Sequence, residues 1–105
     1  MITRTAIFEG TIKPGCEDAF FSGFEALLPL WKRFPHAINV RLLRVTAADP
    51  GAPPIVLVQQ IDYPSEAAVA EALASPVRAE ARAATLELMK LFEGRLYHLL
   101  SPTRD

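Results

Sequence analysis

The chain has 105 residues, of which 50% are hydrophobic and 22% are charged, and its formal net charge at pH 7 is −1. This length supports one hydrophobic core, and this composition excludes the intrinsically disordered class. The slightly negative balance also argues against a general nucleic-acid binder, whose binding face is strongly basic.

The sequence features that indicate a compartment are few. Cys16 is the single cysteine, so it forms no internal disulfide, which favours a reducing compartment. Arg4 and Glu9 interrupt the first segment, so no secretory signal pattern is expected. No apolar run is long enough for a transmembrane helix. We therefore expect a cytoplasmic protein without a membrane partner.

The first half of the chain predicts strand, helix and two further strands. Residues 3–12 alternate as a strand does, and residues 16–34 carry apolar side chains at helical spacing, with Pro29 expected to kink or split that helix. Residues 37–46 form a second predicted strand, and a loop rich in proline and glycine follows it. Residues 55–62 form a third, whose Val/Ile/Leu run is typical of a strand buried on both faces.

The second half predicts two helices and a last strand. Ser65 is expected to cap a helix over residues 66–74. Ser75 and Pro76 are expected to begin another helix, which Gly94 ends, before a strand over residues 95–100. The order β-α-β-β-α-α-β predicts an α+β, ferredoxin-like fold for a single domain over residues 1–105. Its four-stranded antiparallel sheet would carry all helices on one face.

The central strands predict a homodimer. Leu42 and Leu43 point to opposite faces, as do Leu57 and Val58, so both faces of the sheet carry large apolar groups. Helices cover only one of these faces, and a second copy stacked sheet against sheet would cover the other. The alternative is that loops or the C-terminal tail cover it.

Three short segments resemble one known protein family in their order and spacing. They are Ile12-Lys13-Pro14-Gly15 with Glu17, Asp18 and Phe20; Pro29-Leu30 with Phe34-Pro35; and Ala74-Ser75-Pro76 with Ala79, Ala81 and Ala83, closing on Phe92-Glu93-Gly94. Together they resemble the dimeric α/β-barrel superfamily, and within it the EthD-type proteins. The resemblance spans nearly the whole chain.

The resemblance implies a homodimer with a pocket between sheet and helices in each subunit. It also implies small aromatic or polyketide-like substrates and cofactor-free oxygenation, decarboxylation or cyclisation. The chain departs from the family pattern at three places: Leu27 replaces a histidine, His36 replaces a glycine, and Arg78 lies near the place of another histidine. The leucine at position 27 favours an alternative, a non-catalytic homodimer that binds a hydrophobic ligand or a protein partner.

Two histidines are the candidate catalytic residues. His98 lies between Leu96 and Leu100 in the last predicted strand, and it faces the pocket if those leucines face the helices. An imidazole there would act as a general acid or base near neutral pH. The alternative is a core histidine bonded to its neighbours. His36, after Pro35, would line the pocket mouth or lie in an exposed loop.

Four other residues are candidates for substrate binding. Trp31 and Tyr97 would stack on an aromatic ligand, or they belong to the core. Arg41 and Gln60 would orient the ligand, or Gln60 pairs across the dimer interface.

Several other classes of site are not expected. Two distant histidines and one cysteine make no metal cluster, and no glycine-rich loop indicates a phosphate-bearing cofactor, so neither is expected. Arg78 and Arg82 are interpreted as part of a solvated helix face. The third predicted strand contains no aromatic residue for stacking bases, which argues against an RNA-recognition domain.

Overall fold

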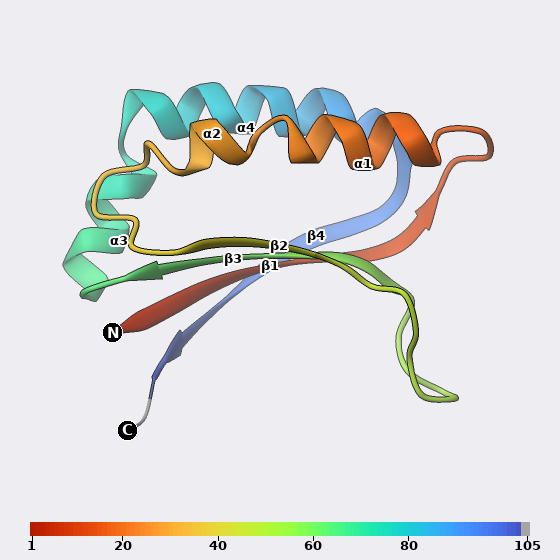
Figure 1. Cartoon of the computed structure of the whole chain (residues 1–105), viewed down its shortest axis with the longest axis horizontal. Coiled ribbons are helices and arrows are strands. Elements are labelled where there is room, and N and C mark those ends of the chain that lie inside the picture. The colour runs from red at the N-terminus through yellow and green to blue at the C-terminus, as the bar shows by residue number, and fades with distance from the viewer. Residues whose placement is uncertain (104–105) are drawn as a thin grey trace.

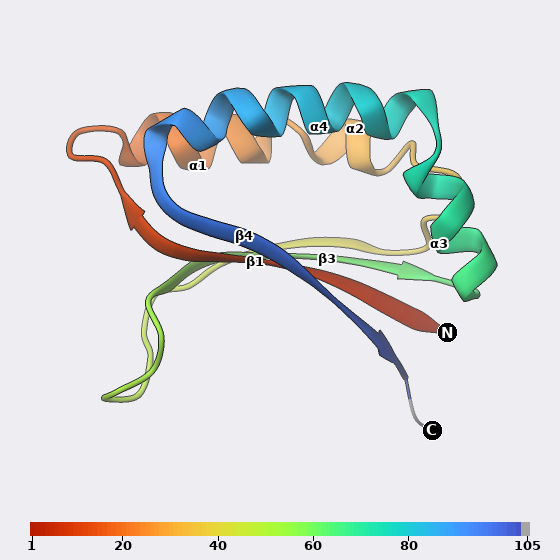
Figure 2. The ribbon, with the colours of Figure 1, turned by 180° about the vertical axis from the view of Figure 1, so that it is seen from behind.

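The computed structural model describes residues 1–103 of the chain. Its elements are β1 (Ile2–Ile12), α1 (Glu17–Glu25), α2 (Leu28–Trp31), β2 (Val40–Arg44), β3 (Ile55–Tyr63), α3 (Glu66–Leu73), α4 (Pro76–Leu88), the 3₁₀ turn η1 (Met89–Leu91) and β4 (Phe92–Pro102). The strands form one antiparallel sheet in the order β2-β3-β1-β4. Helices α1, α2 and α4 lie over one face, and α3 lies at one end of the sheet (Figures 1 and 2). The predicted ferredoxin-like fold is confirmed.

An aromatic cluster holds the first helix on the sheet. Phe8 of β1 faces the helices, and its ring centroid lies 6.1 Å from that of Phe20 and 4.8 Å from that of Phe24, both in edge-on geometry. Phe20 and Phe24 are fully buried and one helical turn apart, so one face of α1 enters the core. This contact fixes the distance between α1 and the sheet, and with it the space left between them.

The first predicted helix is split, as its proline indicated. Helix α1 ends at Glu25 and α2 begins at Leu28, with Pro29 in the first turn of α2. Proline has no N–H to donate to the preceding turn, so it fits the start of a new helix and not the middle of one. Beyond the break, Trp31 turns into the core and is buried.

Two predicted boundaries are wrong. The second strand is shorter than expected, because β2 covers only Val40–Arg44. Gly94 does not end the last helix: α4 ends at Leu88, and Gly94 lies within β4 opposite Gly10. A Cβ atom on Gly94 would lie 2.2 Å from the Glu9 carbonyl oxygen, so glycine is required there by the close approach of two strands.

Both predicted serine caps are confirmed. The Ser65 hydroxyl accepts a hydrogen bond from the Ala68 N–H at 3.1 Å, and the Ser75 hydroxyl accepts one from the Arg78 N–H at 3.2 Å. The caps set where α3 and α4 begin, and so they set which residues of α4 lie above the sheet. Over the described part of the chain, none of the helices has the length and apolar character needed to cross a membrane.

Candidate functional site

A cavity of about 480 Å³ lies between the sheet and the helices. Strands β1, β3 and β4 supply its floor, and α1, α2 and α4 supply its roof. The lining residues are Arg4, Ala6, Phe8, Phe24, Trp31, Phe34, Gln59, Arg78, Ala81, Arg82, Thr85, Leu86, Met89, Leu96 and His98. Its exposed members, Arg82, Leu86 and His98, belong to α4 and β4, so the cavity opens along that edge, which faces the reader in Figure 2.

One part of the lining is an aromatic wall. The rings of Phe24 and Trp31 lie nearly parallel, with centroids 6.5 Å apart and an interplanar angle of 25°. Phe8 and Phe34 extend this wall, and all four side chains are buried. Flat, apolar walls of this kind suit a planar hydrophobic ligand, which they bind by dispersion and by removing its surface from water.

His98 lies in the cavity floor. It faces Ala6 across the β1–β4 ladder, on the side of the sheet that carries the helices. Burial by the cavity walls lowers the pKa of His98 to about 4, and the charges of Arg4 and Arg78 act in the same direction. The ring is therefore neutral at neutral pH, although part of it is exposed at the mouth. Within residues 1–103 it makes no hydrogen bond to another side chain, which leaves both nitrogens for a ligand.

Three arginines border the cavity, and the sequence alone did not indicate them as a site. Arg78 and Arg82 are predicted on a solvated face, but their spacing of four residues places both at the cavity. Arg4 comes from β1, on the same strand face as Ala6 and Phe8. Burial, and then the like charge of Arg78, lower the pKa of Arg4. Basic groups therefore meet beside His98.

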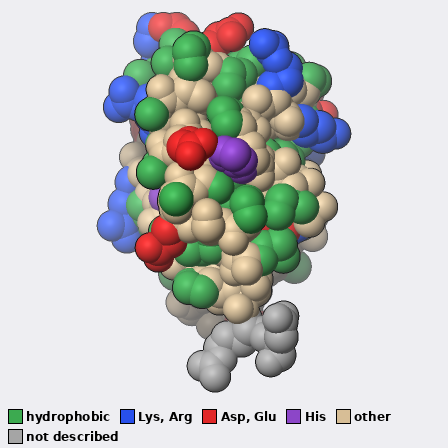
Figure 3. All heavy atoms as spheres, turned by 90° about the vertical axis from the view of Figure 1, so that its left-hand side faces the viewer, with side chains coloured by type: hydrophobic (Ala, Val, Ile, Leu, Met, Phe, Trp, Pro, Cys, Tyr) green, Lys and Arg blue, Asp and Glu red, His purple; other side chains and the backbone are tan. Residues whose placement is uncertain are grey.

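Two predicted site residues lie in different places. Trp31 lines the cavity, as already described. His36 does not line it: its Nε2 lies 2.6 Å from an oxygen of Glu71 in α3, and its backbone has a φ of 66°. This left-handed conformation turns the chain between α2 and β2. Figure 3 views the end of the molecule that carries α3, where a histidine side chain lies against an acidic one.

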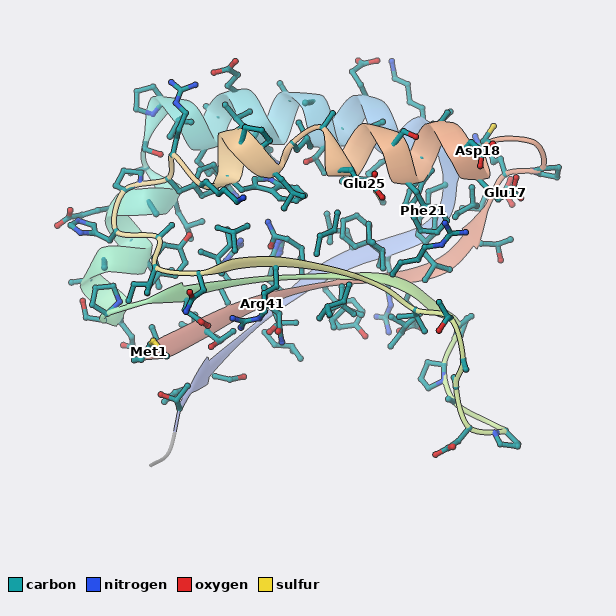
Figure 4. The ribbon with its side chains drawn as sticks, in the orientation of Figure 1. Met1, Glu17, Asp18, Phe21, Glu25 and Arg41 are labelled. Carbon is teal, nitrogen blue, oxygen red and sulfur yellow. The ribbon has the colours of Figure 1, made fainter. Side chains whose placement is uncertain are left out.

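The other three candidates lie on the opposite face of the sheet. Arg41 points away from the helices (Figure 4) and makes hydrogen bonds of 2.9 and 3.1 Å to Asp62. Gln60 accepts a hydrogen bond from Arg41 at 3.2 Å, and the Tyr97 hydroxyl donates one to Glu9 at 3.1 Å. The Arg41 guanidinium holds the pKa of Asp62 well below its usual range. These groups do not reach the cavity.

Comparison with known proteins places the fold but not the family. An EthD family protein from Bacillus halodurans is similar with a TM-score of 0.75, 18% identity and coverage of 99% of both chains. SnoaB, a cofactor-independent oxygenase from Streptomyces nogalater, has a TM-score of 0.67 and 22% identity over 99% of this chain and 93% of its own. An antibiotic biosynthesis monooxygenase has a TM-score of 0.68 and 16% identity over 100% of both chains. No protein-family model and no curated protein matches the chain.

Proposed function

We propose that the protein binds a small aromatic compound in this cavity and that His98 removes a proton from it. The observation that carries the proposal is the combination of an aromatic wall, Phe8, Phe24, Trp31 and Phe34, with one neutral imidazole in the same cavity. The wall holds the ring system, and the imidazole supplies a base within the binding site. The small-molecule function implied by the family resemblance supports the same interpretation.

The charges around His98 favour deprotonation of a bound ligand. A base with a lowered pKa accepts a proton readily only when the anion that it leaves behind is stabilised. Arg4, Arg78 and Arg82 line the same cavity, and their combined positive charge provides that stabilisation. Burial, together with the charges of Arg4 and Arg78, thus keeps the imidazole neutral before the reaction, and the positive charge of the cavity stabilises the ligand anion after it.

Oxygenation without a cofactor is the reaction that we assign to this anion. A planar aromatic ketone with an acidic CH₂ group loses a proton to form a carbanion, and this carbanion reduces O₂ directly. The CH₂ group becomes C=O. One oxygen atom of O₂ enters that carbonyl group, and the other leaves as water with the two hydrogens of the CH₂ group. Two proteins of the same fold are described as a cofactor-independent oxygenase and an antibiotic biosynthesis monooxygenase. Their descriptions support this reaction class, and the chain's own residues supply the base and the cavity.

The test measures binding first and oxygen uptake second. Thermal unfolding is recorded with anthrone, 1-naphthol and aliphatic compounds of similar size, because a ligand of the native state raises its apparent stability. We expect a shift with the aromatic compounds alone, and O₂ uptake with anthrone that His98→Gln abolishes while leaving the shift. His36→Gln is the matched control and should keep both. Binding without uptake would support the non-catalytic alternative, and no shift would refute the cavity's role.

We also propose that a second copy of the chain covers the open face of the sheet. That face carries the apolar side chains Ile7, Leu43, Val58, Tyr97 and Leu99. Its charges occur as pairs, Arg41–Asp62 and Arg95–Glu9, so two copies can stack without net repulsion.

Light scattering after size exclusion tests this dimer. Leu43→Glu should convert it to a monomer, whereas Leu86→Glu, at an exposed leucine on the helical side, should not. A wild-type monomer at high concentration would refute the interface. The cytoplasmic location expected from the sequence is part of the same proposal, and cell fractionation tests it.

A further inference from the structure

We propose that the ligand of the cavity carries a carboxylate, which Arg4 and Arg78 bind while its aromatic part lies against the Phe24–Trp31 wall. This inference rests on the proposed function and adds the chemical class of the ligand. It concerns recognition alone, and it holds whether or not the bound compound is then oxidised.

The charge of the lining is the first observation in its support. Within the described part of the chain, Arg4, Arg78 and Arg82 are the only side chains lining the cavity that are ionised at neutral pH, and no Asp or Glu lines it. The whole chain carries a formal net charge of −1, so the cavity is strongly positive within a protein that is slightly negative. A concave site with apolar walls concentrates such a field and draws in anions.

The cavity arginines also have no protein partner within residues 1–103. None of the described side-chain hydrogen bonds or ion pairs uses the guanidinium of Arg4, Arg78 or Arg82. Three arginines elsewhere in the fold, Arg41, Arg44 and Arg95, do have partners. Arg41 binds Asp62, and Arg44 lies 3.9 Å above the ring centre of Phe21, which points from α1 toward the sheet in Figure 4.

Burial makes the missing partner costly. Arg4 is half-buried, and both burial and the charge of Arg78 lower its pKa, so two like charges meet in a partly dry site. A guanidinium in such a place is stabilised by an anion that replaces the lost water. Two guanidinium groups that border one space match the paired oxygens of a carboxylate, which accepts bidentate hydrogen bonds.

The position of the arginines sets the orientation of the ligand. Arg4 is near the start of β1 and Arg78 is in the first turn of α4, and both of these element ends lie at the same end of the molecule (Figure 2). Phe8, Leu96 and Met89 line the cavity further along the strands and the helix. The arginines therefore lie toward one end of the cavity and apolar side chains line the other, which fits an aromatic carboxylate better than an uncharged ring.

The experiment compares two probes that differ in one charge. Binding of 2-naphthoate and of the neutral 2-naphthamide is measured by calorimetry for the wild-type chain, Arg4→Gln, Arg78→Gln and Arg95→Gln. Arg95 lies on the other face of the sheet, which the proposed dimer covers, and it lines no part of the cavity, so its loss changes net charge equally without touching the cavity. We expect wild-type protein to prefer naphthoate by about tenfold or more, as charge-assisted hydrogen bonds provide.

Each result has a separate meaning. The preference for naphthoate over naphthamide should fall to near unity in Arg4→Gln and in Arg78→Gln, and it should persist in Arg95→Gln. Arg4→Lys keeps the positive charge and replaces Arg4→Gln if that variant does not fold; it should retain part of the preference. Equal binding of both probes by wild-type protein would overturn the carboxylate and leave the aromatic cavity intact. Binding of neither probe would overturn the proposed function as well. An equal loss of preference in Arg95→Gln would assign it to net charge and not to this site.

Discussion

The imidazole of His98 should remain uncharged in solutions where an ordinary histidine is already protonated. Its pKa is lowered from 6.5 to about 4 by burial and by the charges of Arg4 and Arg78. At pH 5.5 a group of pKa 4 is about 3% protonated, whereas one of pKa 6.5 is about 90% protonated. Replacing Arg78 by Gln removes one of the two charges, so the pKa of His98 should rise while burial still holds it below 6.5.

Proton NMR of the imidazole Cε1–H measures both values directly. The chain has two histidines, and His36→Gln removes one signal and so assigns the other. Titration from pH 3 to pH 8 is then repeated with Arg78→Gln and with Arg95→Gln as the control. A wild-type pKa near 6.5 would refute the effect of burial and charge on this ring. An identical pKa in wild-type and Arg78→Gln protein would refute the role of that arginine alone.

The same shift predicts how acid affects the folded state. Because the folded-state pKa of His98 lies below its unfolded value, the unfolded chain binds the proton first as pH falls from about 6.5 to about 4. Stability should therefore decrease with falling pH across this window, and His98→Gln should flatten that part of the curve. Oxygen uptake should persist to about pH 5 and fall near pH 4, since the imidazolium accepts no proton.

Three further changes test the packing around the site. Asp62→Asn should lower the free energy of unfolding in urea by about 2–3 kcal/mol, because this buried carboxylate accepts hydrogen bonds from three side chains. Since the pKa of Asp62 is lowered in the folded protein, its contribution to stability is lost only as pH falls below about 4. Glu87→Gln, at an exposed ion pair, is the control and should change stability by less than about 1 kcal/mol. Gly94→Ala should lower the thermal midpoint sharply and reduce the free energy of unfolding by at least about 2 kcal/mol, because the new Cβ meets the Glu9 carbonyl oxygen. An unchanged midpoint would mean that the two strands can move apart without loss of stability. Phe24→Ala should cost about 3–5 kcal/mol by chemical denaturation and weaken aromatic ligands, and a cost below about 1 kcal/mol would contradict its place in the core.

The fold is predictable because its signals are local. Alternation along β1, the serine caps of α3 and α4, and the proline that splits the first helix each act within a few residues. Gly94 misleads the prediction because its role depends on Gly10, which lies opposite it in the sheet and far from it in sequence. A single glycine after a helix is typical of a helix end, and only the pairing of β1 with β4 shows otherwise.

The site is harder to predict, since it depends on which face of each element meets the helices. The alternation of His98 with Leu96 predicts its position in the cavity, where the structure has it. The same alternation puts Tyr97 on the opposite face, so the two residues cannot share one pocket. Arg4 is absent from the predicted site although it shares a strand face with Ala6 and Phe8, which is a signal that sequence alone contains.

Helix α4 shows the limit of periodicity. The spacing of Ala81 and its neighbours predicts an apolar stripe, and Ala81 is buried as expected. Arg78 and Arg82 flank that stripe, and periodicity alone assigns them to solvent. These two arginines border the cavity between α4 and the sheet. That cavity exists because large side chains on α1 and β1, such as Phe24 and Phe8, hold the helices away from the sheet.

The pairing of β1 with β4 determines when this sheet can form. Ile2 lies opposite Pro102, so the first strand of the chain bonds to the last one, and its other neighbour, β3, begins only at Ile55. Contacts between such distant segments slow folding, because a long loop must close before they contribute. During synthesis β1 emerges first and its edge stays unpaired until β4 has left the ribosome. An unpaired strand edge can join the edge of another chain, so β1 is exposed to strand-to-strand aggregation until β4 is available to pair with it.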